Sequence, residues 1–200
     1  ALGRAIAIAA SPVSSSPTPG APAPRFANEQ ERAQKAIEEF QKVAAKYGDP
    51  YRSQARYFIA ANLLFVDRNK GISDLSELGS NRITEVAILS KFALAQAKET
   101  DGKLDEAIAL YRELAAANSI VVTPETANLR LAKTYVKQGK KKEAADLLFT
   151  IADTARKAKD EEGNPKPESQ AARDAAQELE KIDPARYAQL TPEPPPNMAF

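Results

Sequence analysis

The sequence lacks the two residue types on which most catalytic and metal sites depend. Its 200 residues include no cysteine and no histidine. Without cysteine the chain forms no disulfide and offers no thiolate ligand to a metal. Without histidine it lacks the commonest general base and the commonest metal ligand. Since phosphate-loop, dinucleotide, serine-hydrolase and zinc-protease motifs are also missing, we expect no enzyme, catalytic residue, metal or cofactor.

Long apolar runs and an excess of one charge are missing as well. No stretch of 18 or more apolar residues occurs, so nothing in the sequence is expected to span a bilayer. The 28 basic residues nearly balance the 27 acidic ones, which leaves no net field to attract nucleic acid or an anionic membrane. The dense basic cluster of Lys137, Lys140, Lys141 and Lys142 has no interleaved aromatic residues. We interpret it as a solvated turn, with a nucleic-acid platform as the weaker alternative.

Two stretches in the middle of the chain share a template of five positions. From a leading leucine, the other positions follow at 8, 13, 17 and 20 residues. The first set is Leu94, Gly102, Ala107, Tyr111 and Leu114, and the second is Leu131, Gly139, Ala144, Leu148 and Ile151. The glycine suits the left-handed residue of a short turn, and the small residues let two helices cross closely. The template predicts two successive helix-turn-helix units.

The same frame extends towards the N-terminus with weaker matches. Ser73 precedes Ala107 by 34 residues, and Ala36 precedes Ser73 by 37. A 34-residue period with three-residue insertions resembles the tetratricopeptide repeat, over residues 28–160. The resemblance implies an all-α fold, a tetratricopeptide-like right-handed α-solenoid of antiparallel helix pairs with a C-terminal capping helix.

Composition and the resemblance together divide the chain into five parts. We expect the end of a truncated helix in residues 1–10, a linker rich in proline and serine in 11–25, tetratricopeptide-like repeats in 26–160, a C-terminal capping helix in 161–190 and a flexible tail in 191–200. Two alternatives stay open. Residues 1–10 could be the remnant of a signal peptide, and residues 19–22 could be a polyproline ligand for another protein.

Helical periodicity and turn residues predict the individual elements. Helices are expected over residues 28–47, 51–66, 72–78, 84–99, 104–117, 124–138, 141–159 and 167–182, with one further turn after residue 183. Residues 67–71 are expected to form a turn. In the longer connection 118–123, the apolar residues 120–122 are expected to dock as an extended segment.

Positions on the first helix of each repeat line the inner surface of such a solenoid. In this chain they are mostly apolar with a few polar groups, which suits an apolar segment or a helix of a partner protein. The predicted partner-binding groove consists of Phe58, Asn62, Phe65, Leu89, Phe92, Gln96, Leu129 and Lys133. Alternatively, the phenylalanines are packing residues, and residues 1–24 fold back over them.

A narrower resemblance rests on residues 40–57. They read Phe-Gln-Lys-Val-Ala-Ala-Lys-Tyr-Gly-Asp-Pro-Tyr-Arg-Ser-Gln-Ala-Arg-Tyr, with an aromatic helix end, a Gly-Asp-Pro turn and an Ala-Arg-Tyr helix start. With the leading helix and the proline-rich insertion, this motif resembles tetratricopeptide proteins of the bacterial envelope, in particular the ancillary subunit family of the Sec translocon. The family implies an inner-membrane anchor in an upstream part of the protein, missing from this chain, and a place for the chain on the periplasmic side of the inner membrane.

Two functions of different kinds fit these patterns. The first is a non-enzymatic scaffold for protein–protein interaction, with a chaperone-like or adaptor role towards translocating or envelope proteins. The second is a fixed structural subunit of a larger membrane-associated complex, with its repeats buried against permanent partners. Neither function involves nucleic acid, and membrane contact would come only through the missing anchor.

Overall fold

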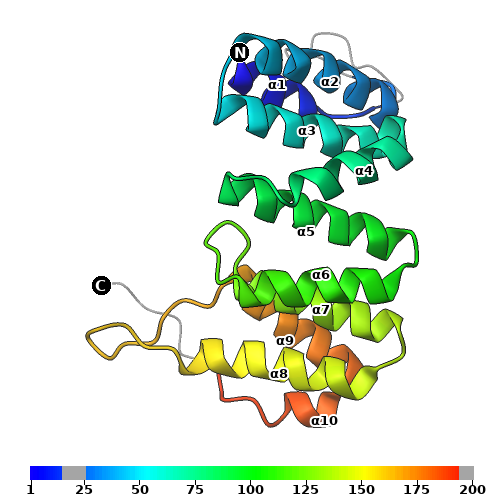
Figure 1. Ribbon diagram of the computed structural model, residues 1–200. Coiled ribbons are helices and arrows are strands. Elements are labelled where there is room, and N and C mark those ends of the chain that lie inside the picture. The colour runs from blue at the N-terminus through cyan, green and yellow to red at the C-terminus, as the bar shows by residue number, and fades with distance from the viewer. Residues whose placement is uncertain (15–25, 194–200) are drawn as a thin grey trace. The chain divides into compact units, whose positions relative to one another are not determined.

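The computed structural model describes residues 1–14 and 26–193, which form helices joined by turns and loops (Figure 1). The chain divides into two compact units, Ala1–Ala97 and Lys98–Phe200. The helices are α1 (Leu2–Ala9), α2 (Glu29–Lys46), α3 (Tyr51–Val66), α4 (Arg68–Leu78), α5 (Thr84–Thr100), α6 (Leu104–Ala116), α7 (Pro124–Lys137), α8 (Lys141–Lys157), α9 (Gln170–Ile182) and α10 (Pro184–Tyr187). Most of the predicted linker, with its possible polyproline ligand, and the end of the predicted tail lie outside the described residues.

Helix α2 of the first unit begins at a side-chain cap. Asn28 Oδ1 accepts a hydrogen bond from Glu31 N at 2.8 Å, and Glu31 Oε2 accepts one from Ala27 N at 2.9 Å. Buried side chains then recur at helical spacing: Ala33, Ala36, Ile37, Phe40 and Val43. This apolar face packs against α3.

Residues 1–10 contain a helix that is part of the core of the first unit. Helix α1 packs against α2, and its buried residues Ala5 and Ile8 share a cluster with Phe40 and Ala55. At its end, Ser11 Oγ donates a hydrogen bond to the carbonyl of the preceding turn. The predicted helix is therefore present, and its apolar side is buried.

A single residue, Asp67, joins α3 to α4. It ends α3, and its side chain caps α4. The prediction of a turn over residues 67–71 is wrong, because α4 begins directly after Asp67. Gly71 lies inside that helix, where an added Cβ would come within 2.8 Å of Leu64 N and 3.0 Å of Ala60 O. The glycine therefore permits a close approach of α4 to α3 and does not make a turn.

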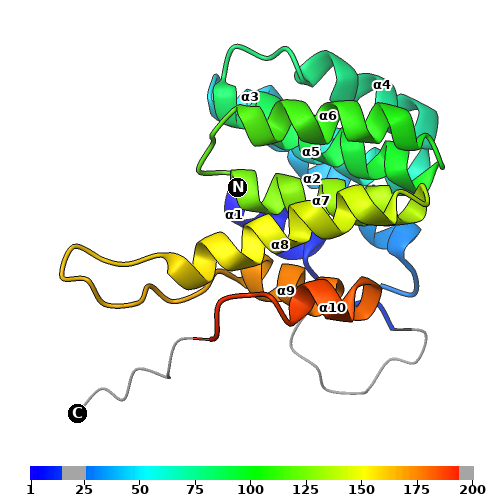
Figure 2. The same ribbon diagram turned by 90° about the horizontal axis from the view of Figure 1, so that it is seen from below.

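In the second unit, α6, α7, α8 and α9 pack one after another (Figure 2). Gly102 and Gly139 precede α6 and α8 with φ angles of 72° and 80°, so both occupy the left-handed region that the template predicted. Leu148 of α8 and Leu179 of α9 are completely buried in a core that also includes residues of α7. Helix α9 therefore covers an apolar face of α8.

Helix α9 begins three residues later than the sequence predicted. Ser169 is its N-cap, and the Ser169 hydroxyl accepts a hydrogen bond from Ala172 N at 3.1 Å. Residues 158–169 form a loop that extends away from α8 in both ribbon views (Figures 1 and 2). The predicted start at Pro167 is wrong because the cap, and not the proline, sets the first turn.

The chain after α10 is held against α8 by two side chains. Arg156, almost completely buried, donates a hydrogen bond to Thr191 O at 2.9 Å and lies 3.3 Å from Glu168 Oε1. Asp153 Oδ1 accepts hydrogen bonds from Thr191 N at 3.1 Å and from Thr191 Oγ1 at 2.7 Å. These contacts fix the described beginning of the predicted tail.

Candidate partner-binding surfaces

The predicted groove residues are shared between the two units, and those on α3 have different environments. The Phe58 ring stacks on Phe40, with centroids 4.7 Å apart and planes at 10°, so Phe58 packs as the alternative interpretation expected. Asn62 Nδ2 donates a hydrogen bond to Phe58 O at 2.8 Å within the same helix. Phe65, by contrast, is 48% exposed. On α3, Phe65 is the predicted residue most accessible to a partner.

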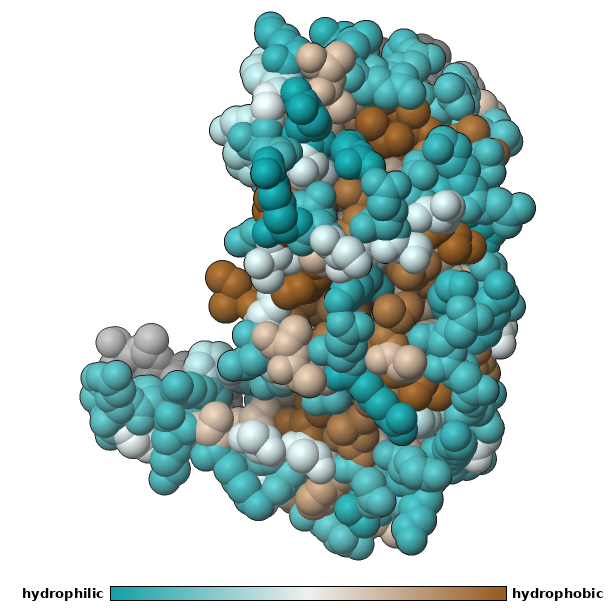
Figure 3. Space-filling model, in the orientation of Figure 1, coloured by the Kyte–Doolittle hydropathy of each residue, from teal (hydrophilic) through white to brown (hydrophobic). Residues whose placement is uncertain are grey.

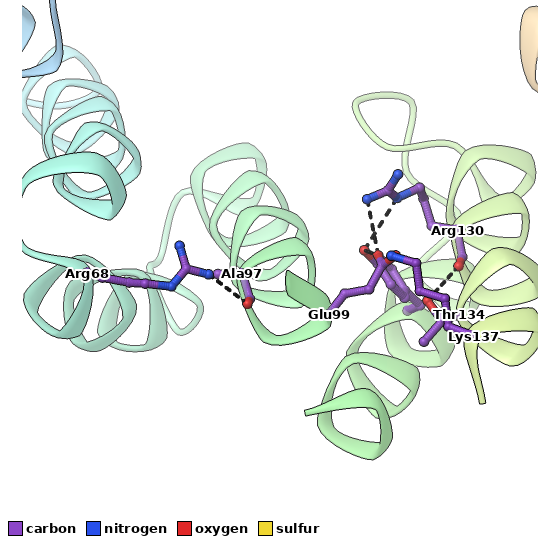
Figure 4. A network of polar contacts seen from close by, with 7 residues as sticks. Arg68, Ala97, Glu99, Arg130, Thr134 and Lys137 are labelled. Carbon is purple, nitrogen blue, oxygen red and sulfur yellow. Dashed lines mark hydrogen bonds and ion pairs between the residues drawn. The ribbon is translucent and has the colours of Figure 1, made fainter. Parts of the chain in front are cut away.

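The three predicted residues on α5 belong to the first unit and share one helix face. Leu89, Phe92 and Gln96 follow one another at spacings of three and four residues, and all are partly buried. Close to them, Arg68 Nη2 donates a hydrogen bond to Ala97 O at 3.0 Å and so ties α4 to α5 (Figure 4). This face of α5 remains a predicted contact surface.

In the second unit, Leu129 and Lys133 differ sharply in accessibility. Leu129 is 6% exposed and packs in the core with α8 and α9, so its side chain is not open to a partner. The reason is α9, which packs against α7 as well as α8. Lys133, one turn further along α7, is partly exposed. The prediction for Leu129 is therefore corrected to a core position, whereas Lys133 stays a candidate.

A buried carboxylate of the second unit contacts α6 and α7. The Glu99 side chain, at the end of α5, is 4% exposed. Its Oε1 accepts a hydrogen bond from Lys137 Nζ at 2.6 Å (Figure 4). Its Oε2 accepts hydrogen bonds from Tyr111 Oη at 2.8 Å and from Arg130 Nη2 at 3.1 Å. The carboxylate is thus paired with two cations and one phenol.

Opposing effects set the charge of Glu99. Burial alone would raise the pKa of Glu99, but hydrogen bonds from Lys137 and Tyr111 and the charge of Arg130 outweigh it and hold the pKa below the ordinary value of 4.5. Burial raises the pKa of the Tyr111 phenol, which therefore stays protonated and donates. At neutral pH the network consists of a fixed carboxylate and two fixed cations.

The chemistry of this network is that of binding and support. A carboxylate whose pKa is lowered is a weak general base at neutral pH, where an effective base needs a pKa near the working pH. Among the described residues, no group of three or more acidic residues could hold a metal ion. The Glu99 network orients two cations on α7.

In the part of the chain that the structure describes, no helix is long and apolar enough to cross a membrane.

The connection between α6 and α7 exposes two apolar side chains. The sequence predicted that residues 120–122 dock as a segment, but only Val122 is buried, whereas Ile120 is 95% exposed and Val121 is 39% exposed. Val122 directly precedes the N-cap Thr123, a position from which an apolar side chain usually packs on the helix. Hydrophobic surface projects at the left edge of Figure 3, where Figure 1 draws this loop.

The lysines of the basic cluster make separate contacts. Lys137 binds the α5 carboxylate, and Lys140 Nζ lies 5.9 Å from the ring centre of Tyr135. Lys141 and Lys142 are exposed in the first turn of α8. The cluster in the sequence is therefore divided among different environments in the structure.

Arg130 and Tyr111 are the site residues that sequence reasoning missed. A signal for the first was present, because Arg130, Lys133 and Lys137 follow one another at spacings of three and four residues. This spacing places cations on one helix face. The partnership of Tyr111 with Glu99 had no comparable signal, since the two residues lie 12 positions apart on different helices.

The chain is similar to solved structures of one repeat protein. A crystal structure of a Podosopora anserina kinesin light chain-like protein with nearly identical TPR-like repeats shares 17% identity, at a TM-score of 0.57 over 79% of this chain and 81% of that one. A variant of the same protein gives 17% identity and a TM-score of 0.58 over 79% and 80% of the two chains. No family model and no curated protein matches this chain.

Helix packing within each unit and this structural likeness confirm an all-α, tetratricopeptide-like repeat fold. At 17% identity the likeness extends to the fold alone.

Proposed function

We propose that the chain is a non-enzymatic scaffold that binds a segment of a partner protein, in a chaperone-like or adaptor role at the bacterial envelope. The observation that carries this proposal is the accessibility of Phe65 and Lys133, which occupy predicted groove positions on first helices of their repeats. A large aromatic side chain exposed at such a position suits contact with a protein. The partner is a translocating, envelope or complex subunit protein.

The envelope location rests on the motif in residues 40–57. In the structure these residues hold the turn between α2 and α3. Asp49 Oδ1 accepts a hydrogen bond from Ser53 Oγ at 2.7 Å, and the rings of Tyr47 and Tyr51 meet edge to face at 6.0 Å. The motif therefore has a structural role, and its resemblance to envelope proteins supports a periplasmic location. Protease accessibility in intact and osmotically opened cells of the source tests this location.

Site-specific crosslinking tests the scaffold function. A photoreactive amino acid replaces Phe65 in the full chain, and the crosslinked products are identified by mass spectrometry. We expect adducts with several different proteins, each in low yield, because a chaperone-like scaffold exchanges its partners.

Arg56 provides a matched control on the same helix. It lies nine residues before Phe65, on the opposite face of α3, and its side chain is 47% exposed. The same photoreactive residue at this position is expected to give few adducts. Equal labelling from both positions, or no labelling from Phe65, would contradict a binding surface on this face of α3.

The exposed loop between α6 and α7 favours the second candidate function, a fixed structural subunit. Ile120 and Val121 are adjacent in one loop and both exposed, and apolar side chains that lie together on a surface are typical of a contact with another protein. A fixed subunit would give one crosslinked partner in stoichiometric amount, at Ile120 as well as at Phe65. That result would support the fixed structural subunit and contradict the scaffold that exchanges its partners.

A further inference from the structure

Three cations lie along one face of α7. Arg130, Lys133 and Lys137 are separated by three and four residues, a spacing that brings side chains to one side of an α-helix. Thr126 continues this face by one turn. At a rise of about 1.5 Å per residue, the cations cover roughly 10 Å of helix length. All three side chains are at least partly exposed.

One carboxylate balances only part of this charge. Glu99 binds Arg130 and Lys137, and its carboxylate is directed into the unit, where little of it meets solvent. The acidic residues in the first turn of α6 are engaged elsewhere, with Gln138 and Lys98. The α7 face therefore retains an excess of positive charge, although the whole chain carries a formal net charge of only +1.

The two kinds of cation on this face have complementary properties. Glu99 holds Arg130 and Lys137 in fixed positions, so a partner would not have to order these side chains at its own cost. Lys133 makes no hydrogen bond or ion pair with any residue that the structure describes. Its charge is free to pair with a group from outside.

We propose that the α7 face of Arg130, Lys133 and Lys137 binds an acidic segment of a partner protein. The inference rests on the proposed scaffold function and names the chemistry of its partner in the second unit. Lys133 supplies the free charge at the centre of the face. In an extended partner segment, acidic side chains at alternate positions lie about 7 Å apart, so two of them fit the length of the three cations.

Carboxylates of a polypeptide fit this face better than a nucleic acid does. The residues of the face are Thr126, Arg130, Lys133 and Lys137, and none of them is aromatic. Single-stranded nucleic acids bind to proteins through aromatic platforms as well as cations. A guanidinium and two ammonium groups in a row suit carboxylates, which accept hydrogen bonds from both.

Fluorescence anisotropy with a defined probe tests the proposal. The probe is a labelled peptide of about 12 residues in which glutamate alternates with alanine, long enough to cross the face in an extended conformation. A second peptide has glutamine in place of every glutamate. We expect the full chain to bind the glutamate peptide at least about tenfold more tightly, a difference that narrows as salt is raised.

Charge reversal on the face provides the decisive variant. Lys133→Glu is expected to weaken binding of the glutamate peptide about tenfold or more, because it places a like charge in the centre of the face. Lys142→Glu makes the same change of net charge at an exposed lysine of α8 and is expected to stay within about twofold of the unchanged chain. Circular dichroism checks that both variants fold. If Lys133→Glu does not fold, Lys133→Gln takes its place and is expected to weaken binding of the glutamate peptide by a smaller factor.

Several results would overturn the inference. They are equal binding of the two peptides, unchanged binding by the Lys133 variants, and an equal loss in Lys142→Glu. Failure of the chain to bind the glutamate peptide would also overturn it, while adducts from Phe65 would still support the scaffold. If the photoreactive residue at Phe65 gives no adducts but the chain binds the glutamate peptide specifically, the α3 surface is ruled out as a binding site. The proposal for the α7 face then still holds.

Discussion

Gly71 and Gly102 are glycines for different physical reasons. Gly102 has a φ of 72°, which side chains disfavour, and it makes a turn. Gly71 lies within α4 and faces the backbone of α3 so closely that a Cβ has no room. The sequence shows the same letter in both places. Only the packing of neighbouring helices separates a glycine that turns the chain from one that lets helices touch.

Gly71→Ala is expected to destabilise the chain although alanine is the better helix former. Its Cβ would meet the backbone at Leu64 and Ala60, which cannot move independently of α3. We expect a loss of about 2 kcal/mol in the free energy of unfolding, measured by urea denaturation. Gly48→Ala is the control, because nothing lies within 4 Å of its Cβ, and it should change stability by less than about 0.5 kcal/mol. Equal effects would contradict the close approach.

Glu99 illustrates how one residue can couple stability to pH. Because its folded pKa lies below the ordinary value of 4.5, ionised Glu99 stabilises the fold above that pH. The contribution is lost as the pH falls through the lower pKa of the folded state. Acid therefore weakens the contacts that fix Arg130 and Lys137.

Glu99→Gln is expected to lower the free energy of unfolding by roughly 1–3 kcal/mol at pH 7, since it removes charge-assisted hydrogen bonds from a nearly buried site. The difference between the variant and the unchanged chain should shrink below pH 4.5. Urea denaturation at a series of pH values measures it. Glu106→Gln breaks a more exposed ion pair with Lys98 and should have the smaller effect. A pH-independent difference would contradict the role of the charge.

At the scale of elements, periodicity and caps predicted most helices because those signals are local. The extent of α2 and the turn glycines before α6 and α8 were predicted correctly. Errors arose where distant elements decide. Leu129 was predicted to face a partner, but α9 covers it, and no pattern near residue 129 indicates that contact.

The segment after α10 depends on α8 through Asp153. Hydrogen bonds from Lys157 and Thr191 lower the pKa of Asp153 from its ordinary value of 3.8 to about 2, so the carboxylate of the folded chain keeps its charge until the pH falls through about 2. Asp153→Ala should therefore release Thr191. We expect amide exchange at Thr191 to become about tenfold faster, measured by hydrogen–deuterium exchange. Thr154→Ala, at an exposed neighbouring residue, is the control and should leave that exchange unchanged.

At the scale of the whole molecule, near neutrality and exposed apolar residues act together. The sequence pI is 8.1, so little net repulsion keeps chains apart near that pH. Ile120 offers apolar surface for association under the same conditions. The candidate site shows a related limit of sequence reasoning. The repeat pattern predicted Lys133 and Phe65 as accessible positions. The exposure of Ile120 was not predicted, because in this loop only Val122, next to the N-cap of α7, is buried.

Ile120→Ser is expected to reduce self-association of the isolated chain. Light scattering at increasing protein concentration near pH 8 should show a smaller rise in apparent mass than for the unchanged chain. Val122→Ser lies in the same loop but at a buried position, so it should lower thermal stability instead. A chain that stays monomeric at all concentrations without the change would contradict this expectation.

The single-residue joint at Asp67 has a consequence for how the chain can change during evolution. A helix connection of one residue does not tolerate a change in length. Inserting or deleting a residue there would rotate α4 by about 100° about its own axis and would move Gly71 away from α3. Residues 161–164, which are exposed at the outer end of the loop between α8 and α9, can absorb length changes without such rotation. Related chains should therefore keep a constant length around residue 67 and vary in length between α8 and α9.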